Sequence, residues 1–102
     1  MTQLLDSTKL IREQVGDDIY TYYPLGKHIV IAPGICGGRP TFKYTRLEVT
    51  LILSLLANGE NIEQVIADYA SSHLSPGAIQ EAILLAGEAF IQTTRQIYPL
   101  AA

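Results

Sequence analysis

The chain has 102 residues, of which 48% are hydrophobic and 17% are charged, and its formal net charge is −3. This length allows one domain with one modest core, and no apolar stretch approaches the roughly 20 residues that a membrane-spanning helix needs. The single cysteine excludes an intrachain disulfide framework. Because the N-terminus also lacks the charged start and the apolar run of a signal peptide, we expect a cytoplasmic protein.

The first predicted elements lie before residue 25. Asp6 or Ser7 can cap a short helix that would end at Gly16. Residues 19–23 are rich in β-formers and stop at Pro24, which favours either a strand or an extended arm.

The most specific segment of the chain is IVIAPGICGGRPTFKYTRL, residues 29–47. Its β-branched start and the Gly37-Gly38 pair, which can adopt positive φ, predict a tight hairpin. Thr45 and Glu48 then have the T-x-x-E spacing of a capping box, so we expect a helix to begin at Arg46.

Three helices are predicted in the second half of the chain. The first is apolar nearly all round and stops at Asn58-Gly59, and the second begins after the cap residue Asn61. The third follows Ser75-Pro76, a cap and the residue favoured at the first helical position. Its expected inward stripe consists of Ile79, Ile83, Ala86, Gly87, Phe90 and Thr94.

The third helix carries more apolar surface than two short neighbouring helices can cover. Exposed apolar surface of this extent is typical of an interface, so we expect a homodimer, or a complex, held by this helix. The candidate interface residues are Ala82, Leu85, Ala89 and Phe90.

These elements predict an all-α core. We expect a three-helix, helix-turn-helix arrangement, preceded by a short β-hairpin and an N-terminal accessory helix. Residues 1–25 would form the accessory helix and the extended arm, and residues 26–102 would form a single globular unit.

Charge is unevenly distributed along this chain. Residues 19–47 contain no acid, whereas residues 48–102 contain Arg95 as their only base. The bases of the first segment are Lys27, Arg39, Lys43 and Arg46. Such a segment is typical either of an anion-facing surface, where phosphate neutralisation dominates nucleic-acid affinity, or of an ordinary solvated face.

Residues 28–95 resemble the domain-of-unknown-function family 433 (DUF433), small bacterial proteins similar to VapB-type antitoxins. The family pattern ICGGxPxIxGTRI appears here as ICGGRPTFKYTRL over residues 35–47, with Tyr44 at the place of the family's glycine. The resemblance implies a homeodomain-like three-helix fold. For members paired with a PIN-like nuclease gene, it also implies an antitoxin role.

No catalytic or metal-binding constellation is visible in the sequence. His28 and His73 are far apart in the sequence and neither has a nearby Cys or second His at ligand spacing, and an idle thiol is the simplest interpretation of Cys36. We therefore expect neither an enzyme nor a bound cofactor.

Two functions remain open. One is an antitoxin-like protein-interaction module that dimerises through the third helix and neutralises a PIN-like toxin. The other is a helix-turn-helix DNA-binding regulator, in which Arg39, Lys43 and Arg46 contact phosphates and Gln80 reads the groove. The composition favours the first, because residues 75–90 contain no base.

Overall fold

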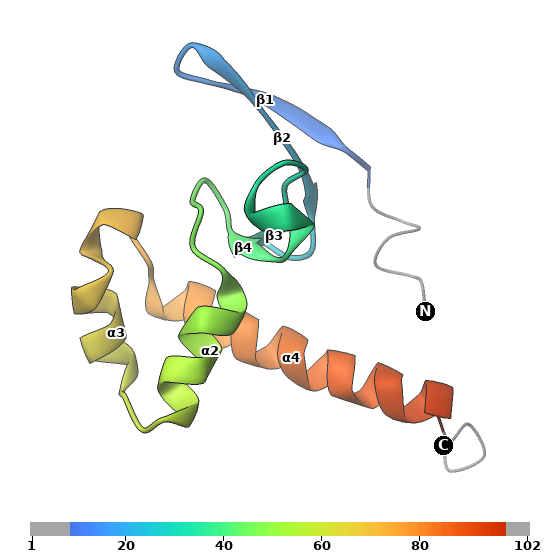
Figure 1. Ribbon diagram of the computed structural model, residues 1–102, viewed down its shortest axis with the longest axis vertical. Helices are drawn as coiled ribbons and strands as arrows, with labels where there is room; N and C mark the ends of the chain where they lie inside the picture. The colour runs from blue at the N-terminus through green and yellow to red at the C-terminus, as the bar shows by residue number, and fades with distance from the viewer. Residues whose placement is uncertain (1–8, 98–102) are drawn as a thin grey trace.

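A computed structural model describes residues 9–97 of the chain (Figure 1). The strands are β1 (Ile11–Val15), β2 (Asp18–Pro24), β3 (Ile29–Ile31) and β4 (Thr41–Phe42), and they form one antiparallel sheet in the order β1-β2-β3-β4. The helices are α2 (Val49–Ala57), α3 (Ile62–Asp68) and α4 (Pro76–Ile97). Short 3₁₀ turns lie at Cys36–Gly38 and Ala70–Ser72.

The expected all-α core is wrong, because the sheet supplies part of the main core. Ile29 of β3 and Phe42 of β4 are buried together with residues of all three helices, among them Ile52, Val65 and Ile79. A smaller buried cluster lies within the sheet region and contains Tyr22, Val30 and Ala32. The fold therefore combines an antiparallel sheet with a helical layer.

The predicted N-terminal accessory helix is also wrong over its described part. Residues 11–15 form β1, which pairs with β2 from Ile11 opposite Tyr22 to Val15 opposite Asp18. A two-residue turn joins the strands, and Gly16 adopts the positive φ of 61° that such turns favour. Strand pairing thus overrides the weak helical pattern, while Asp6 and Ser7 lie outside the described residues.

The predicted hairpin exists, but its connection is longer than expected. β3 and β4 pair antiparallel, and residues 32–40 join them through the 3₁₀ turn. Gly37 and Gly38 have φ values of 63° and 82°, which confirms their conformational role.

The expected start of the first core helix is wrong by three residues. α2 begins at Val49, and its N-cap Glu48 makes no side-chain capping bond. The Thr45 hydroxyl instead accepts the Leu47 N–H at 3.0 Å and donates to the Phe42 carbonyl at 2.7 Å. Residues 45–47 are therefore a turn that closes the sheet before the helix starts.

The other predicted helix ends are confirmed. Gly59, with a φ of 101°, follows the end of α2. The Asn61 side chain accepts the Gln64 N–H at 2.7 Å, and the Ser75 hydroxyl accepts the Ala78 N–H at 3.1 Å.

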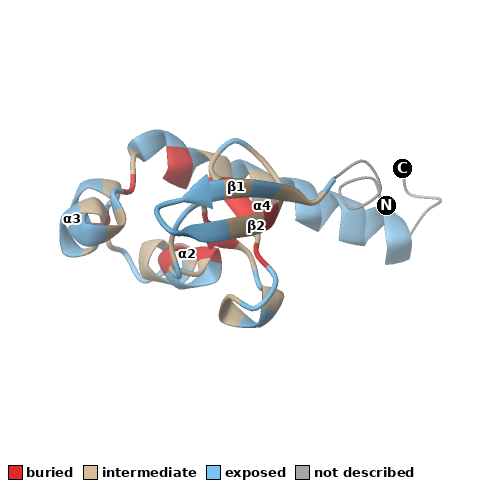
Figure 2. Cartoon of the chain, turned by 90° about the horizontal axis from the view of Figure 1, so that it is seen from above, coloured by how far each residue is buried: buried red, intermediate tan, exposed pale blue. Residues whose placement is uncertain are grey.

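Within residues 9–97, α4 buries side chains only in its first half. Ala78, Ile79 and Ala82 are buried, and every residue from Ala86 to Ile97 is exposed. Figure 1 shows this helix extending beyond the other elements, and its far half is coloured as exposed in Figure 2. The Cα radius of gyration, 14.9 Å, exceeds the about 13 Å expected for a compact domain of 100 residues.

The expected inward stripe of this helix is wrong beyond Ile79. Ile83 is 45% exposed and Phe90 is 77% exposed. The helix instead turns a side with two small alanines, Ala78 and Ala82, toward the core. Small residues there allow the backbones of the sheet and of α2 to approach closely.

Candidate functional site

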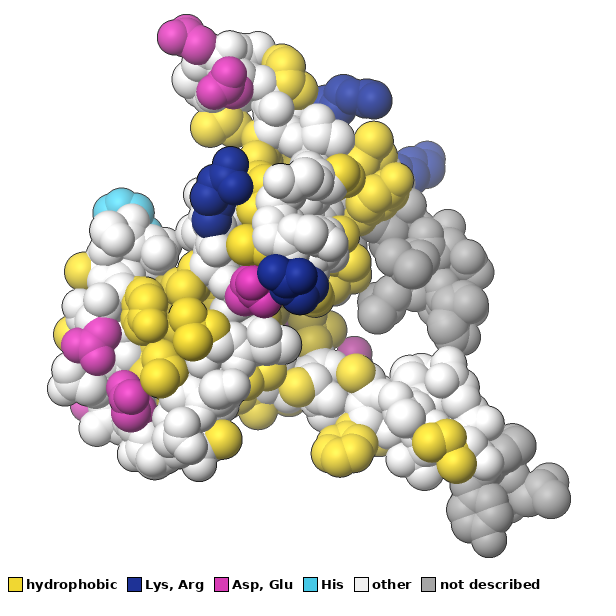
Figure 3. Space-filling model, in the orientation of Figure 1, with side chains coloured by type: hydrophobic (Ala, Val, Ile, Leu, Met, Phe, Trp, Pro, Cys, Tyr) yellow, Lys and Arg dark blue, Asp and Glu magenta, His cyan; other side chains and the backbone are white. Residues whose placement is uncertain are grey.

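The free half of α4, residues 86–97, carries large apolar side chains. Phe90, Ile91 and Ile97 are 77%, 53% and 77% exposed, and hydrophobic side chains stand out along this helix in Figure 3. Single exposed apolar residues are ordinary on a protein surface, whereas contiguous exposed apolar patches are typical of interaction sites.

The exposed residues of α4 include a stripe with coiled-coil spacing. Steps of four and three residues alternate along it, so these positions fall on one side of the helix. We call this the α4 stripe; it consists of Ile83, Gly87, Phe90, Thr94 and Ile97. Large side chains alternate in it with glycine and threonine, an arrangement that suits interlocking with a second helix.

A different side of α4 lines an apolar groove of about 870 Å³. The opposite wall of the groove comes from the sheet region and from α2, with Leu25, Ile29, Val49 and Leu53. Glu88, Gln92 and Arg95 of α4 form its polar edge.

The four candidate interface residues do not share one free surface. Ala82 is buried within the chain and is unavailable to a partner, and Leu85 is half-buried against the core. Ala89 is exposed and lines the apolar groove, whereas Phe90 belongs to the α4 stripe. The structure therefore leaves Ala89 and Phe90 free on two sides of α4.

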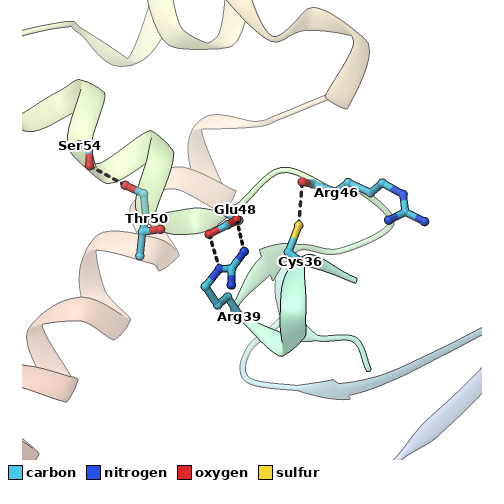
Figure 4. Close-up of polar contacts among 6 residues, drawn as sticks. All are labelled: Cys36, Arg39, Arg46, Glu48, Thr50 and Ser54. Carbon is cyan, nitrogen blue, oxygen red and sulfur yellow. Dashed lines mark hydrogen bonds and ion pairs between the residues drawn. The ribbon is translucent and has the colours of Figure 1, made fainter. Parts of the chain in front are cut away.

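The predicted phosphate-binding residue Arg39 has an internal partner. Its Nε and Nη2 donate to the two carboxylate oxygens of Glu48 at 2.9 and 3.0 Å (Figure 4). This bidentate pair raises the pKa of Arg39 and lowers that of Glu48. Much of the positive charge of Arg39 is thus compensated within the chain.

Arg46 points away from this ion pair in Figure 4, and it is exposed. Among residues 9–97, neither Arg46 nor Lys27 forms a salt bridge. The backbone carbonyl of Arg46 accepts a hydrogen bond from Cys36 Sγ at 3.1 Å, which gives that thiol a structural contact.

Lys43 lies within a network of tyrosines. Its Nζ is 4.8 Å from the ring centroid of Tyr22 and 5.0 Å from that of Tyr44, and 4.0 Å from Glu13 Oε2. The hydroxyls of Tyr22 and Tyr44 donate to the two oxygens of Glu13 at 2.6 and 2.7 Å. These bonds, foremost the one from Tyr22, hold the pKa of Glu13 below its ordinary value.

A second cavity, which we call the basic pocket, has a volume of about 750 Å³. It lies between the loop after β4 and the turn that joins α3 to α4, two segments that stand side by side in Figure 1. Its basic lining residues are Lys27, His28, Lys43, Arg46 and His73. The structure thus brings Lys43 and Arg46 together as predicted, but Arg39 and Gln80 are not among the lining residues.

Glu81 positions one wall of the basic pocket. Its carboxylate accepts the backbone N–H groups of Lys27 at 2.8 Å and of His28 at 2.7 Å. A Cβ on Gly26 would lie 2.7 Å from this carboxylate, so glycine is required for the contact. Sequence reasoning missed this role, because more than 50 residues separate the partners and no local pattern marks the pairing.

The family of the chain is decided by its central segment. A family model described as "Protein of unknown function (DUF433)" matches residues 29–86, more than half of the 102 residues. The chain therefore belongs to the DUF433 family. No curated protein and no solved structure matched it.

The DUF433 match begins at β3 and ends within α4. The β1–β2 hairpin lies before it, and nearly all of the free half of α4 lies after it. β1, β2 and the exposed end of α4 therefore lie outside the segment that matches the family model.

Tyr44 occupies the position where the DUF433 pattern quoted above has glycine. It retains the left-handed conformation, with a φ of 68°. Its backbone N–H donates to the Tyr20 hydroxyl at 2.9 Å, and its own hydroxyl binds Glu13. These contacts, made with strands outside the family match, hold a tyrosine in a conformation that glycine adopts at lower cost.

Within residues 9–97, no group of three His, Cys, Asp or Glu side chains is arranged to hold a metal ion. In the same part of the chain, we find no helix with both the length and the hydropathy of a bilayer-spanning segment.

Proposed function

We propose that this protein is a protein-interaction module that forms a homodimer by pairing the α4 stripe with that of a second copy. The observation that carries the proposal is the free half of α4, which exposes Phe90, Ile91 and Ile97 and has no buried residue within the described part of the chain. At about 1.5 Å per residue, its 12 residues offer roughly 18 Å of helix to a partner.

The alternation of side-chain sizes supports pairing with an identical helix. Phe90 lies at the centre of the α4 stripe, flanked by Gly87 and Thr94. In a symmetric dimer, a large side chain of one copy can enter the space left by a small one of the other. Burying a side chain such as Phe90 stabilises association by about 1.5–3 kcal/mol.

The charge of the free half is compatible with self-association. It contains one acid, Glu88, and one base, Arg95, so two copies meet without a net charge penalty.

In such a dimer, the apolar groove on the other side of α4 stays open. We propose that this groove receives a toxin-like partner of the PIN nuclease type. The resemblance to VapB-type antitoxins supports this role, and the mainly apolar groove lining offers the surface that it needs.

Sequencing of the neighbouring genes, followed by co-expression with a PIN-like nuclease found there, tests the antitoxin role, and the absence of such a gene would count against it. The wild type should relieve the growth arrest caused by the nuclease and co-purify with it. Ala89→Arg, which changes the groove, should lose both effects and still dimerise.

Ile19→Arg is the matched control, because Ile19 is exposed on β2 and is not among the residues that line the groove. It should behave as the wild type. An Ala89→Arg variant that still neutralises the nuclease would contradict docking in the groove.

A further inference from the structure

The basic pocket is unusual for a chain with a net charge of −3. Its lining contains three of the seven Lys and Arg residues of the chain, namely Lys27, Lys43 and Arg46. Both histidines of the chain also line it. No Asp or Glu is among the lining residues. Positive charge is thus collected in one concave place on an otherwise acidic molecule.

The basic residues reach the pocket from separate parts of the fold. Lys27 and His28 come from the β2–β3 turn, Lys43 and Arg46 from the loop after β4, and His73 from the turn before α4. Bringing like charges together costs free energy unless an anion compensates them.

Neutral hydrogen-bond donors complete the lining. The hydroxyl residues Ser71, Ser72 and Ser75 are part of it, whereas the hydroxyl of Thr45, which also lines the pocket, already donates to the Phe42 carbonyl. The pocket also reaches the first turn of α4, through Ser75 and Ala78, where the helix dipole adds positive potential. Hydroxyls beside Lys and Arg are the usual partners of phosphate oxygens.

Two carboxylates lie near the pocket, and both are engaged elsewhere. Glu81 accepts the backbone N–H groups of Lys27 and His28, and Glu13 accepts the two tyrosine hydroxyls. Glu13 also approaches Lys43 at 4.0 Å, which reduces the contribution of that lysine. Lys27 and Arg46 therefore provide most of the uncompensated charge.

We propose that the basic pocket binds a phosphate group. Its volume of about 750 Å³ falls within the range of about 300–1,000 Å³ typical of small-molecule sites, so the phosphate can belong to a nucleotide or to a nucleic-acid chain. The site is separate from the α4 stripe and from the apolar groove, and it does not depend on dimerisation.

Isothermal titration calorimetry at low ionic strength tests this site. The probes are inorganic pyrophosphate, 5′-AMP and a short single-stranded DNA, with adenosine as the control that lacks phosphate. At least one phosphate probe should bind, and adenosine should not. Lys27→Ala and Arg46→Ala should each weaken binding about tenfold, the loss expected for one charge-assisted contact.

Arg12→Ala is the matched control, because Arg12 is an exposed base on β1 outside the pocket lining. It should retain wild-type affinity. Binding of pyrophosphate and 5′-AMP would identify a small-molecule phosphate site, and binding of the DNA alone would identify a site for a nucleic-acid backbone. Failure of all three phosphate probes, or an equal loss in Arg12→Ala, would overturn the proposal.

Discussion

Two carboxylates connect parts of the fold that are distant in the sequence. Glu81 ties the β2–β3 turn to α4, and Glu13 of the β1–β2 hairpin ties this hairpin to the loop after β4 through Tyr44. Both loops line the basic pocket, so these two residues set its shape.

Gly26→Ala should destabilise the protein. The added Cβ would lie 2.7 Å from the Glu81 carboxylate and would force it away from the two backbone N–H groups. We expect the free energy of unfolding, measured by urea denaturation, to fall by about 1–3 kcal/mol, as for loss of charge-assisted hydrogen bonds.

Gly77→Ala provides the control for this change. A Cβ there would meet nothing closer than 3.8 Å, and Gly77 lies in the first turn of α4. This variant should be as stable as the wild type or more stable, since alanine is favoured over glycine in helices by about 0.5–1 kcal/mol. Equal stabilities of the two variants would contradict the role given to Glu81.

Glu13 should make stability depend on acid pH. The hydroxyls of Tyr22 and Tyr44 hold its pKa below the ordinary 4.5. A carboxylate with a lowered pKa in the folded state contributes stability above about pH 4.5, and this contribution is lost as the pH falls through the lowered value. Glu13→Gln should therefore lose less stability than the wild type between neutral and acid pH.

Urea midpoints measured across this pH range check the expectation. The pKa of Glu48 is lowered by Arg39 in the same way, so some acid sensitivity should remain in Glu13→Gln. Glu48→Gln is the matched variant, which tests whether Glu48 causes this remaining acid sensitivity. Parallel midpoint curves for Glu13→Gln and the wild type would show that the tyrosine network contributes nothing.

At the residue scale, only part of the candidate site could be predicted from the sequence. The lack of acids over residues 19–47 indicated either an anion-facing surface or an ordinary solvated face, and the structure places Lys43 and Arg46, but not Arg39, in the lining of one pocket. The pairing of Arg39 with Glu48 was not foreseen, because the T-x-x-E spacing assigned that carboxylate to a helix cap. The position of His73 in the pocket lining depends on tertiary folding, and no local sequence pattern indicates it.

At the element scale, the helix caps are the best-defined local features. Asn61 accepts the Gln64 N–H at the start of α3, as its place before an apolar pattern indicated. α3 has only seven residues, so it depends strongly on this cap and on the burial of Val65.

Asn61→Ala should lower the free energy of unfolding by about 0.5–2 kcal/mol, the usual cost of losing an N-cap. Gln64→Ala is the control. Its side chain bonds Asp68 at an exposed position, so the change should stay within about 0.5 kcal/mol. Thermal or urea unfolding of both variants measures the difference, and an unaffected Asn61→Ala variant would rule out this cap.

The helices were easier to predict from the sequence than the strands. Asparagine, serine and proline mark the starts of α3 and α4, and asparagine and glycine mark the end of α2, through local chemistry. β1, in contrast, is stabilised by pairing with β2 and by the contact of Glu13 with Tyr22, and neither interaction has a local signature. The fold class was therefore wrong, although each predicted core helix exists.

At the scale of the whole molecule, the two ends of α4 have different roles. Its first half completes the core between the sheet and the other helices, and its second half extends beyond them. The family match ends at residue 86, where the exposed half begins. We therefore expect association through α4 to be a property of this chain's own extension.

Sedimentation equilibrium on the wild type and on Phe90→Asp tests this association most directly. Phe90 is 77% exposed, so the variant should fold normally, and Ile19→Asp on β2 is the control. We expect the wild type and Ile19→Asp to show twice the 11.2 kDa chain mass, and Phe90→Asp to shift toward the single-chain mass. A wild type that stays at the single-chain mass at high micromolar concentration would contradict dimerisation through the α4 stripe.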